Sequence, residues 1–241
     1  MSLITITNLT KHYTSGDETV AALRGIDLAV TAGEFVTIMG QSGSGKSTLL
    51  AMLGGMSHPT SGDISISGVR LYDLSAEKLA DFRASHLGFV FQSFHLIPYL
   101  TALENVMLPL AIAPLKRAEK VAAAREALEQ VGLAGKADRL PNQLSGGEQE
   151  RVAIARAIVN SPQIIFADEP TGNLDSRTSA DVMELFTRLN EGGQTVVMVT
   201  HNPENCAYAD RTIHLKDGLV VQEGENVLSS RKREGRAFRV A

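Results

Sequence analysis

The chain has 241 residues, of which 44% are hydrophobic and 21% charged, values close to the average for globular domains. This length can bury a sizeable core, as one domain or as two closely joined domains. The formal net charge of -4 argues against a protein that holds nucleic acid over its whole surface, and the single Cys206 excludes an internal disulfide.

Neither a signal peptide nor a membrane span is expected. The opening segment MSLITITNLT lacks the basic region and the long apolar stretch of a secretory signal. No apolar run approaches the roughly 18 residues that a membrane-spanning helix needs. Work at a membrane would therefore require a partner that spans it.

The chain begins with two regions of alternating apolar and polar residues. They lie at residues 3–30, for example at Ile4 and Ile6, and at 62–68, which read GDISISG. This alternation predicts antiparallel strands with one covered face. In contrast, EFVTIMG, QIIFADEP and QTVVMVTH are continuous apolar runs, which are typical of parallel strands buried on both faces.

Residues 99–160 contain no convincing strand and are rich in Ala, Leu, Glu and Arg, which favours helices. We therefore predict an α/β fold with a mainly parallel core sheet, an N-terminal antiparallel β subdomain and a helical insertion. The predicted bounds are 1–91 and 161–227 for the core, 92–160 for the helical subdomain and 228–241 for a basic tail. The segment LKDGLVV predicts a hairpin with Asp217 and Gly218 in its turn. The tail is interpreted as a solvated extension, with a membrane-surface role as the alternative.

The segment GQSGSGKST follows a predicted strand, opens a predicted helix and fits the phosphate-loop pattern G-x-x-x-x-G-K-[ST]. In such a loop, main-chain amides surround the β-phosphate, Lys46 bridges the β- and γ-phosphates, and the Ser47 hydroxyl binds Mg²⁺. An ordinary glycine turn is the alternative. The predicted nucleotide-binding residues are Gly40, Gln41, Ser42, Gly43, Ser44, Gly45, Lys46, Ser47 and Thr48.

Asp168 and Glu169 end the apolar strand IIFA, where adjacent carboxylates would repel one another unless a cation or proton relieved them. This pattern predicts that Asp168 holds Mg²⁺, directly or through water, and that Glu169 polarises an attacking water. Pro170 keeps Glu169 out of the α region. His201 closes the next apolar strand, so we predict that it contacts the γ-phosphate; a structural histidine is the alternative.

Two further residues have open interpretations. Gln92 follows the strand LGFVF and is either a neutral metal ligand or a packed or surface glutamine. Tyr13, in KHYTSG, either stacks on adenine or is an aromatic residue of the sheet or turn.

A second glycine-rich helix start occurs in LSGGEQERVAIARAIV, residues 144–159. Ser145 and Glu148 have capping-box spacing, but Gly146 and Gly147 each cost a helix roughly 1 kcal/mol relative to alanine. Bare amides at a helix start suit an anion. The pattern therefore predicts a second phosphate-binding element.

These motifs occur in the order and spacing of the ATP-binding cassette (ABC) transporter ATPases, which the chain resembles over residues 3–225. The resemblance implies a P-loop NTPase ABC cassette that hydrolyses ATP with Mg²⁺, with Tyr13 stacking on adenine and Gln92 as the coupling and Mg²⁺ glutamine. It also implies a homodimer in which a signature segment caps the γ-phosphate held by the other copy. That segment comprises Leu144, Ser145, Gly146, Gly147, Glu148 and Gln149, and the implied dimer loop includes Asn173 and Asp175.

The segments TGNLD and SFHLIPYLTALENVMLPL are similar to those of the lipoprotein-releasing (LolD-type) and macrolide-exporter (MacB-type) branch. This similarity implies a peripheral subunit at the cytoplasmic face of the inner membrane, which transmits force to a separate integral membrane permease. Docking is predicted around Phe94, Leu96, Ile97 and Tyr99, with packing of the insertion onto the core as the alternative. Glu150 stands where many relatives have glutamine.

Two other functions remain open. The first is that of a cell-division (FtsE-type) ATPase, which transmits force without transport. The second is that of a soluble ABC ATPase of DNA or ribosome maintenance, which the short insertion and the single cassette disfavour. The sequence does not identify a transported substrate.

Overall fold

The computed structural model describes residues 2–16 and 18–226, so the predicted basic tail 228–241 lies outside the described residues. The chain forms two compact units, the first from residues up to Ala80 and from Leu189 onward, the second from Asp81–Arg188. The chain passes from one unit to the other within α2 (Ala76–His86) and α6 (Ser176–Glu191). Within the described ranges, no helix combines the length and apolar character needed to cross a bilayer.

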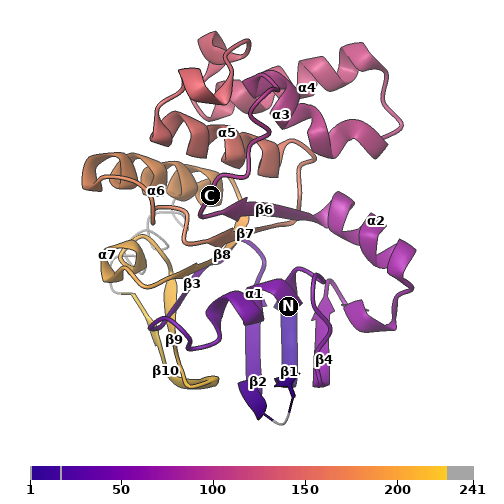
Figure 1. Ribbon diagram of the computed structural model, residues 1–241, viewed down its shortest axis with the longest axis vertical. Coiled ribbons are helices and arrows are strands. Elements are labelled where there is room, and N and C mark those ends of the chain that lie inside the picture. The colour runs from indigo at the N-terminus through magenta and orange to yellow at the C-terminus, as the bar shows by residue number, and fades with distance from the viewer. Residues whose placement is uncertain (1, 17, 227–241) are drawn as a thin grey trace, which may run out of the picture. The chain divides into compact units, whose positions relative to one another are not determined.

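The first unit begins with an antiparallel sheet, as the alternating sequence predicts. Its strand order is β2-β1-β4-β5, and Figure 1 shows β2, β1 and β4 side by side. Ile4 and Ile6 are buried while their neighbours Thr5 and Thr7 are exposed, so one face of β1 is covered. The strands are β1 (Ser2–Ser15), β2 (Glu18–Thr31), β4 (Ser61–Ile66) and β5 (Val69–Arg70), followed by the 3-10 turn Leu71–Asp73.

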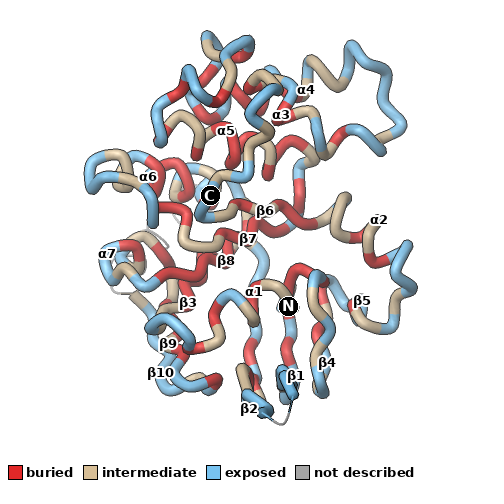
Figure 2. Tube along the Cα trace, viewed as in Figure 1, coloured by how far each residue is buried: buried red, intermediate tan, exposed pale blue. Residues whose placement is uncertain are grey.

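The first unit also contains parallel strands. β3 (Phe35–Met39) lies between β8 (Thr195–Thr200) and β9 (Arg211–Lys216) and pairs in parallel with both. β10 (Leu219–Glu225) pairs antiparallel with β9, which confirms the predicted hairpin. All six residues of β8 are buried, as expected for a parallel strand covered on both faces, and Figure 2 shows this strand in red. The helices of this part are α1 (Lys46–Leu53) and α7 (Pro203–Cys206).

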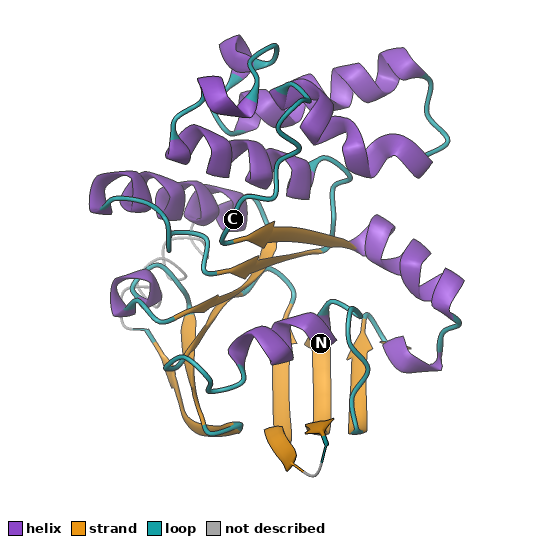
Figure 3. Ribbon diagram, viewed as in Figure 1, coloured by secondary structure: helices purple, strands orange, loops and turns teal. Residues whose placement is uncertain are grey.

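The second unit combines a parallel strand pair with a group of helices. β6 (Leu87–Phe91) pairs in parallel with β7 (Ile164–Asp168), and no strand occurs between residues 99 and 160, as predicted. Three helices of this unit contact one another and lie together in Figure 3. They are α3 (Ala102–Met107), α4 (Arg117–Gln130) and α5 (Gly146–Ile158), with 3-10 turns at Leu108–Ile112, Ala134–Lys136 and Pro141–Gln143.

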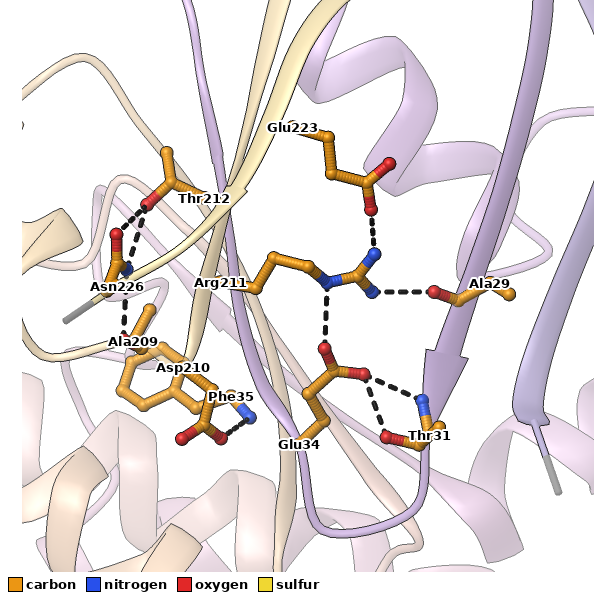
Figure 4. A network of polar contacts seen from close by, with 10 residues as sticks. All are labelled: Ala29, Thr31, Glu34, Phe35, Ala209, Asp210, Arg211, Thr212, Glu223 and Asn226. Carbon is orange, nitrogen blue, oxygen red and sulfur yellow. Dashed lines mark hydrogen bonds and ion pairs between the residues drawn. The ribbon is translucent and has the colours of Figure 1, made fainter. Parts of the chain in front are cut away.

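A network around Arg211 holds the turn before β3 to the β9–β10 hairpin within the first unit (Figure 4). The Arg211 guanidinium donates to Glu34 Oε1 at 2.8 Å and to the Ala29 carbonyl at 2.6 Å, and it also pairs with Glu223. The other carboxylate oxygen of Glu34 accepts from the backbone and hydroxyl of Thr31 at 2.8 and 3.0 Å. Because Glu34 is buried and fully paired, the network fixes the start of β3, which leads into the phosphate loop.

Candidate functional site

The predicted phosphate loop of the first unit connects β3 to α1. Gly43 and Gly45 have φ values of 80 and 103°, in the left-handed region that glycine adopts without steric cost. Helix α1 has no side-chain cap at Gly45 and no acidic residue in its first turn. Its N-terminal amides and the positive end of its dipole therefore suit a bound anion.

Neighbouring backbone explains why two of the loop glycines cannot carry a side chain. A Cβ atom at Gly40 would lie 2.3 Å from the Leu215 carbonyl oxygen, and one at Gly45 would lie 2.5 Å from that of Ala22. The Gly218 amide also donates to the Ser44 carbonyl at 3.1 Å. The loop is thus held between β2 and the β9–β10 hairpin.

Two polar groups of the loop fit phosphate. The buried Lys46 ammonium donates to the carbonyls of Gly40 and Gln41 at 2.7 and 3.1 Å, so it lies over the loop. The Ser44 hydroxyl is buried and has no hydrogen-bond partner among the residues that the structure describes. A phosphate oxygen would supply the acceptor that this hydroxyl requires.

His201 lies at the same strand edge as the phosphate loop. Met39 and Thr200 are paired in the parallel β3–β8 ladder, so Gly40 and His201 follow neighbouring strand ends. His201 is exposed.

Tyr13, the predicted adenine-stacking residue, lies near the end of β1 and is 47% exposed. The Lys11 ammonium lies 5.0 Å from the centre of its ring. Both His201 and Tyr13 keep their predicted roles as proposals.

The predicted acidic residues lie in the second unit. Phe91 and Asp168 are paired in the parallel β6–β7 ladder, so Gln92 and Glu169 follow neighbouring strand ends. The backbone of Glu169 has a φ of 50°, a left-handed conformation that costs a non-glycine residue on the order of 1–3 kcal/mol. Glu169 thus lies outside the right-handed α region, as expected for a residue before proline, but in the left-handed region instead of the extended conformation that such a residue favours.

The chain after the acidic pair lies against Gln92. The Asn173 side-chain amide donates to the Gln92 carbonyl at 2.7 Å. A Cβ atom at Gly172 would lie 2.7 Å from Nε2 of the Gln92 side chain. The family resemblance implies that Asn173 belongs to a dimer loop, but neither contact was predictable from sequence, because each joins positions about 80 residues apart.

The donor set of the second unit fits Mg²⁺. Asp168 and Gln92 offer a carboxylate and an amide oxygen at one strand edge, and Mg²⁺ prefers such hard oxygen ligands. Across residues 2–16 and 18–226, no group of three or more His, Cys, Asp or Glu side chains could hold a metal. Mg²⁺ commonly uses one or two carboxylates together with water and substrate phosphates, so a larger cluster is not required. The third predicted ligand, Ser47, belongs to the first unit.

The signature segment begins α5 with the capping box that its sequence predicts. The Glu148 amide donates to Ser145 Oγ at 3.3 Å, and the Ser145 amide donates to the Glu148 carboxylate at 2.9 Å. This second bond lowers the pKa of Glu148, with Lys136 adding to the effect. Leu144 is buried, and its carbonyl accepts from the Gln149 side chain at 3.1 Å.

The two glycines of this helix start differ in their surroundings. A Cβ atom at Gly147 would lie 2.2 Å from Thr178 Cγ2, whereas one at Gly146 would have its nearest contact, Leu174 Cδ2, at 3.4 Å. Thr178 is itself held by Asp175, which accepts from its amide at 3.0 Å and its hydroxyl at 2.7 Å. These bonds lower the pKa of Asp175. Close packing is therefore a second reason for glycine at position 147, one that the sequence analysis did not find.

The fold and the loop at Gly40–Thr48 define an α/β protein whose strand–loop–helix has the sequence and backbone of a phosphate loop. A family model described as "ABC transporter" matches residues 23–172. The chain belongs to this family.

Individual relatives agree with this assignment. The lipoprotein-releasing system ATP-binding protein LolD of Geobacter metallireducens is 50% identical, over 92% of this chain and 99% of that protein. The macrolide export ATP-binding/permease protein MacB of Rhodopirellula baltica is 49% identical over 92% of this chain, which spans only 33% of that protein. A dimeric post-hydrolysis structure of the ATP-binding cassette MJ0796, bound to ADP and Pi, has a TM-score of 0.84 and 46% identity, covering 92% and 98% of the two chains.

These comparisons confirm the predicted family, the cassette fold and the ABC-type ATP-hydrolase class. The predicted roles of individual site residues and the predicted subdomain bounds remain proposals. The two compact units divide the chain at Ala80 and Arg188, so the second unit contains β6 and β7 in addition to the helices.

Proposed function

We propose that the chain is the ATP-hydrolysing subunit that energises a separate integral membrane permease, in lipoprotein release or in macrolide or peptide export by force transmission. The observation that carries the proposal is the loop before α1, whose left-handed glycines, uncapped helix start and buried Lys46 suit the phosphates of ATP. The similarity to LolD over nearly its whole length supports a subunit that works with a separate permease.

In this proposal, the loop amides and Lys46 bind and orient the phosphates. Ser47, Asp168 and Gln92 would hold Mg²⁺, which would supply positive charge to neutralise charge developing on the phosphates. Glu169 accepts the proton of the attacking water as general base, and His201 contacts the γ-phosphate. The strained backbone of Glu169 supports its assignment, because such conformations cluster at active sites.

A second copy of the chain would complete the site. Ser145 and Gly146 are exposed at the start of α5, where an anion from another copy could reach the helix amides. The dimeric structure of the similar cassette MJ0796 supports a homodimer. We place the γ-phosphate of one copy against the signature segment of the other, with Asn173 and Asp175 near the dimer interface.

The proposed permease-docking surface lies in the second unit. Tyr99 and Ile112 are 78% and 72% exposed, and Leu108 and Leu115 are also exposed. Phe94, Leu96 and Ile97, which the sequence suggested to be exposed, are half-buried, so we assign contact with the permease to the four exposed residues. Attachment to a permease would place the subunit at the cytoplasmic face of the inner membrane.

Co-purification from detergent-solubilised membranes tests this proposal. A tagged chain should recover an integral membrane protein, and Tyr99→Ser with Ile112→Ser should reduce recovery while leaving ATP binding intact. Val221→Ser is the matched control, since Val221 is 58% exposed but lies in the first unit. Recovery without a membrane protein, but with nucleic acid or ribosomes, would favour the DNA- or ribosome-maintenance alternative. A permease partner with no transported substrate would favour the cell-division alternative.

A further inference from the structure

The segment that follows Gln92 has an unusual backbone conformation. Phe94 and His95 have φ values of 57 and 49°, so two consecutive non-glycine residues lie in the left-handed region. Each such residue costs on the order of 1–3 kcal/mol and persists only where its surroundings hold it in place. Something outside the segment must therefore hold this turn.

Arg156 makes the contacts that hold the turn. Its Nη2 donates to the Phe94 carbonyl at 2.7 Å, and its Nη1 donates to the His95 carbonyl at 2.6 Å. A planar guanidinium can serve two neighbouring acceptors with a fixed fork, which a lysine ammonium cannot reproduce. These two bonds join sites that are 61 and 62 residues apart in the sequence.

Arg156 lies on the helix that begins with the signature segment. It is ten residues beyond Gly146 in α5, which at 1.5 Å per residue corresponds to about 15 Å of helix. The Gln92 segment is therefore held by two side chains, by Arg156 at Phe94 and His95 and by Asn173 at the Gln92 carbonyl.

Among residues 2–16 and 18–226, the donors of Arg156 bond to this turn and to no acidic side chain. Burial lowers the pKa of Arg156. Glu150 lies on the same helix. However, both carboxylate oxygens of Glu150 are buried without a hydrogen-bond partner in the described part of the chain. Two Arg156 nitrogens are thus bonded to main-chain oxygens of the turn instead of forming a bonded ion pair with Glu150.

We propose that Arg156 is a positioning residue: by holding the carbonyls of Phe94 and His95, it keeps Gln92 at the end of β6 and links that position to the signature helix. The inference rests on the proposed role of Gln92 in binding Mg²⁺. In the described contacts, Arg156 touches neither the phosphate loop nor the acidic pair. It therefore acts on the site only through the turn that follows Gln92, and it is not among the predicted site residues.

The substitution Arg156→Lys tests this role in the full chain, because it keeps the charge but removes the fork. Positioning groups behind a metal ligand typically contribute about tenfold or more to activity or metal affinity, so kcat should fall about tenfold. The Mg²⁺ concentration for half-maximal hydrolysis should rise by a similar factor. The KM for ATP should stay nearly unchanged, since the phosphate loop is not altered.

Asn160→Ala is the matched control. Asn160 donates to the carbonyls of Ala84 and Pro109 at 3.0 and 3.4 Å, so its loss also removes side-chain bonds to backbone in the same unit. It should lower the melting temperature without moving the Mg²⁺ dependence. If Arg156→Lys changes only the melting temperature, as this control does, the inference is overturned.

A double-mutant cycle with Gln92→Ala separates the inference from the proposed function. If Arg156 acts through Gln92, adding Arg156→Lys to Gln92→Ala should change kcat and the Mg²⁺ dependence little further. Fully additive effects would overturn the inference but leave the role of Gln92 intact. An unchanged Mg²⁺ dependence in Gln92→Ala alone would contradict the assignment of Gln92, and the inference would fall with it.

A second variant covers the case in which Arg156→Lys does not fold. His95→Pro fixes φ near −65°, which is incompatible with the left-handed turn, while the exposed position and the intact α5 spare the core. It should reproduce the lower kcat and the higher Mg²⁺ requirement. Parental kinetics in His95→Pro would show that the turn does not position Gln92 and would overturn the inference.

Discussion

Gly147 lies so close to Thr178 that a Cβ atom at position 147 would stand 2.2 Å from the Thr178 methyl carbon. Thr178 is hydrogen-bonded to Asp175, which belongs to the proposed dimer loop. The start of the signature helix and the start of α6 are thus packed together within the second unit. A substitution that adds volume at position 147 is therefore expected to displace the Thr178 side chain.

The first prediction concerns this contact. Gly147→Ala should lower the free energy of unfolding by about 1–3 kcal/mol, because the overpacked methyl group outweighs the gain in helix propensity. Thr178→Ser removes the obstructing methyl carbon but retains the hydroxyl that bonds to Asp175, so the double variant should recover most of the loss. Urea unfolding measures both values. Gly146→Ala is the control, since its nearest contact is at an ordinary 3.4 Å; an equal loss there would contradict the packing explanation.

The second prediction concerns Gly172. A methyl group at this position would lie 2.7 Å from Gln92 Nε2, and the flexible Gln92 side chain would move away. Gly172→Ala should therefore fold normally but raise the Mg²⁺ requirement of ATP hydrolysis about tenfold, as expected for a displaced ligand. Titration of ATPase activity with Mg²⁺ measures the effect. The same substitution in a Gln92→Ala background should have little consequence, and a large additional effect would show that Gly172 acts by another route.

The third prediction concerns Glu150, which is fully buried. Burial raises its pKa to about 9 from 4.5, although the Arg156 charge opposes the shift. The unfolded chain releases this proton above pH 4.5, whereas the folded protein retains it until about pH 9. Between these values, Glu150 should lower stability by about 1.4 kcal/mol for each unit of rising pH.

Glu150→Gln should remove this pH-dependent loss of stability, because glutamine does not titrate. The unfolding free energy of the variant should therefore exceed that of the parent protein by an amount that grows as the pH rises from 6 to 8. Chemical denaturation at several pH values measures it. Glu148→Gln provides the control: the Ser145 amide lowers the pKa of Glu148 from 4.5, so its contribution is lost only as the pH falls below this value and should not change between pH 6 and 8. A pH-independent difference between parent and Glu150→Gln would show that Glu150 is ionised in the folded state.

Local patterns predicted much of the fold. The continuous apolar runs became the buried strands Ile164–Asp168 and Thr195–Thr200, and the apolar stripe of α5 is buried at Val152, Ile154, Ala155 and Ile158. These features depend on residues a few positions apart, so the sequence contains them directly. The phosphate loop and the capping box of Ser145 were predictable for the same reason.

Contacts between distant positions were not predictable in this way. The bonds from Arg156 to Phe94 and His95, and the approach of Gly172 to Gln92, depend on how separate elements pack. The left-handed backbone of Phe94 has no local signal, since a bulky aromatic residue rarely adopts it, whereas histidine is one of the residue types enriched in this region. Likewise, Glu150 is charged and lies in a polar stretch of sequence, and only the packing around α5 reveals that it is buried.

The central claim is that Glu169 is the general base of an ATP hydrolysis reaction that requires two copies of the chain. Glu169→Gln preserves size and hydrogen bonding but removes the basic oxygen, so hydrolysis should fall by about 10²- to 10⁴-fold. ATP binding should survive, because Lys46 and Ser47 are unchanged. Lys46→Ala is the comparison, and it should fail to bind or position the nucleotide.

The most direct measurement is size-exclusion chromatography of Glu169→Gln with saturating Mg-ATP, run beside a phosphate-release assay. We expect an ATP-loaded dimer with strongly reduced phosphate release for Glu169→Gln, and no such dimer for Lys46→Ala. A Glu169→Gln protein that remains monomeric, or that releases phosphate at the parental rate, would contradict the account.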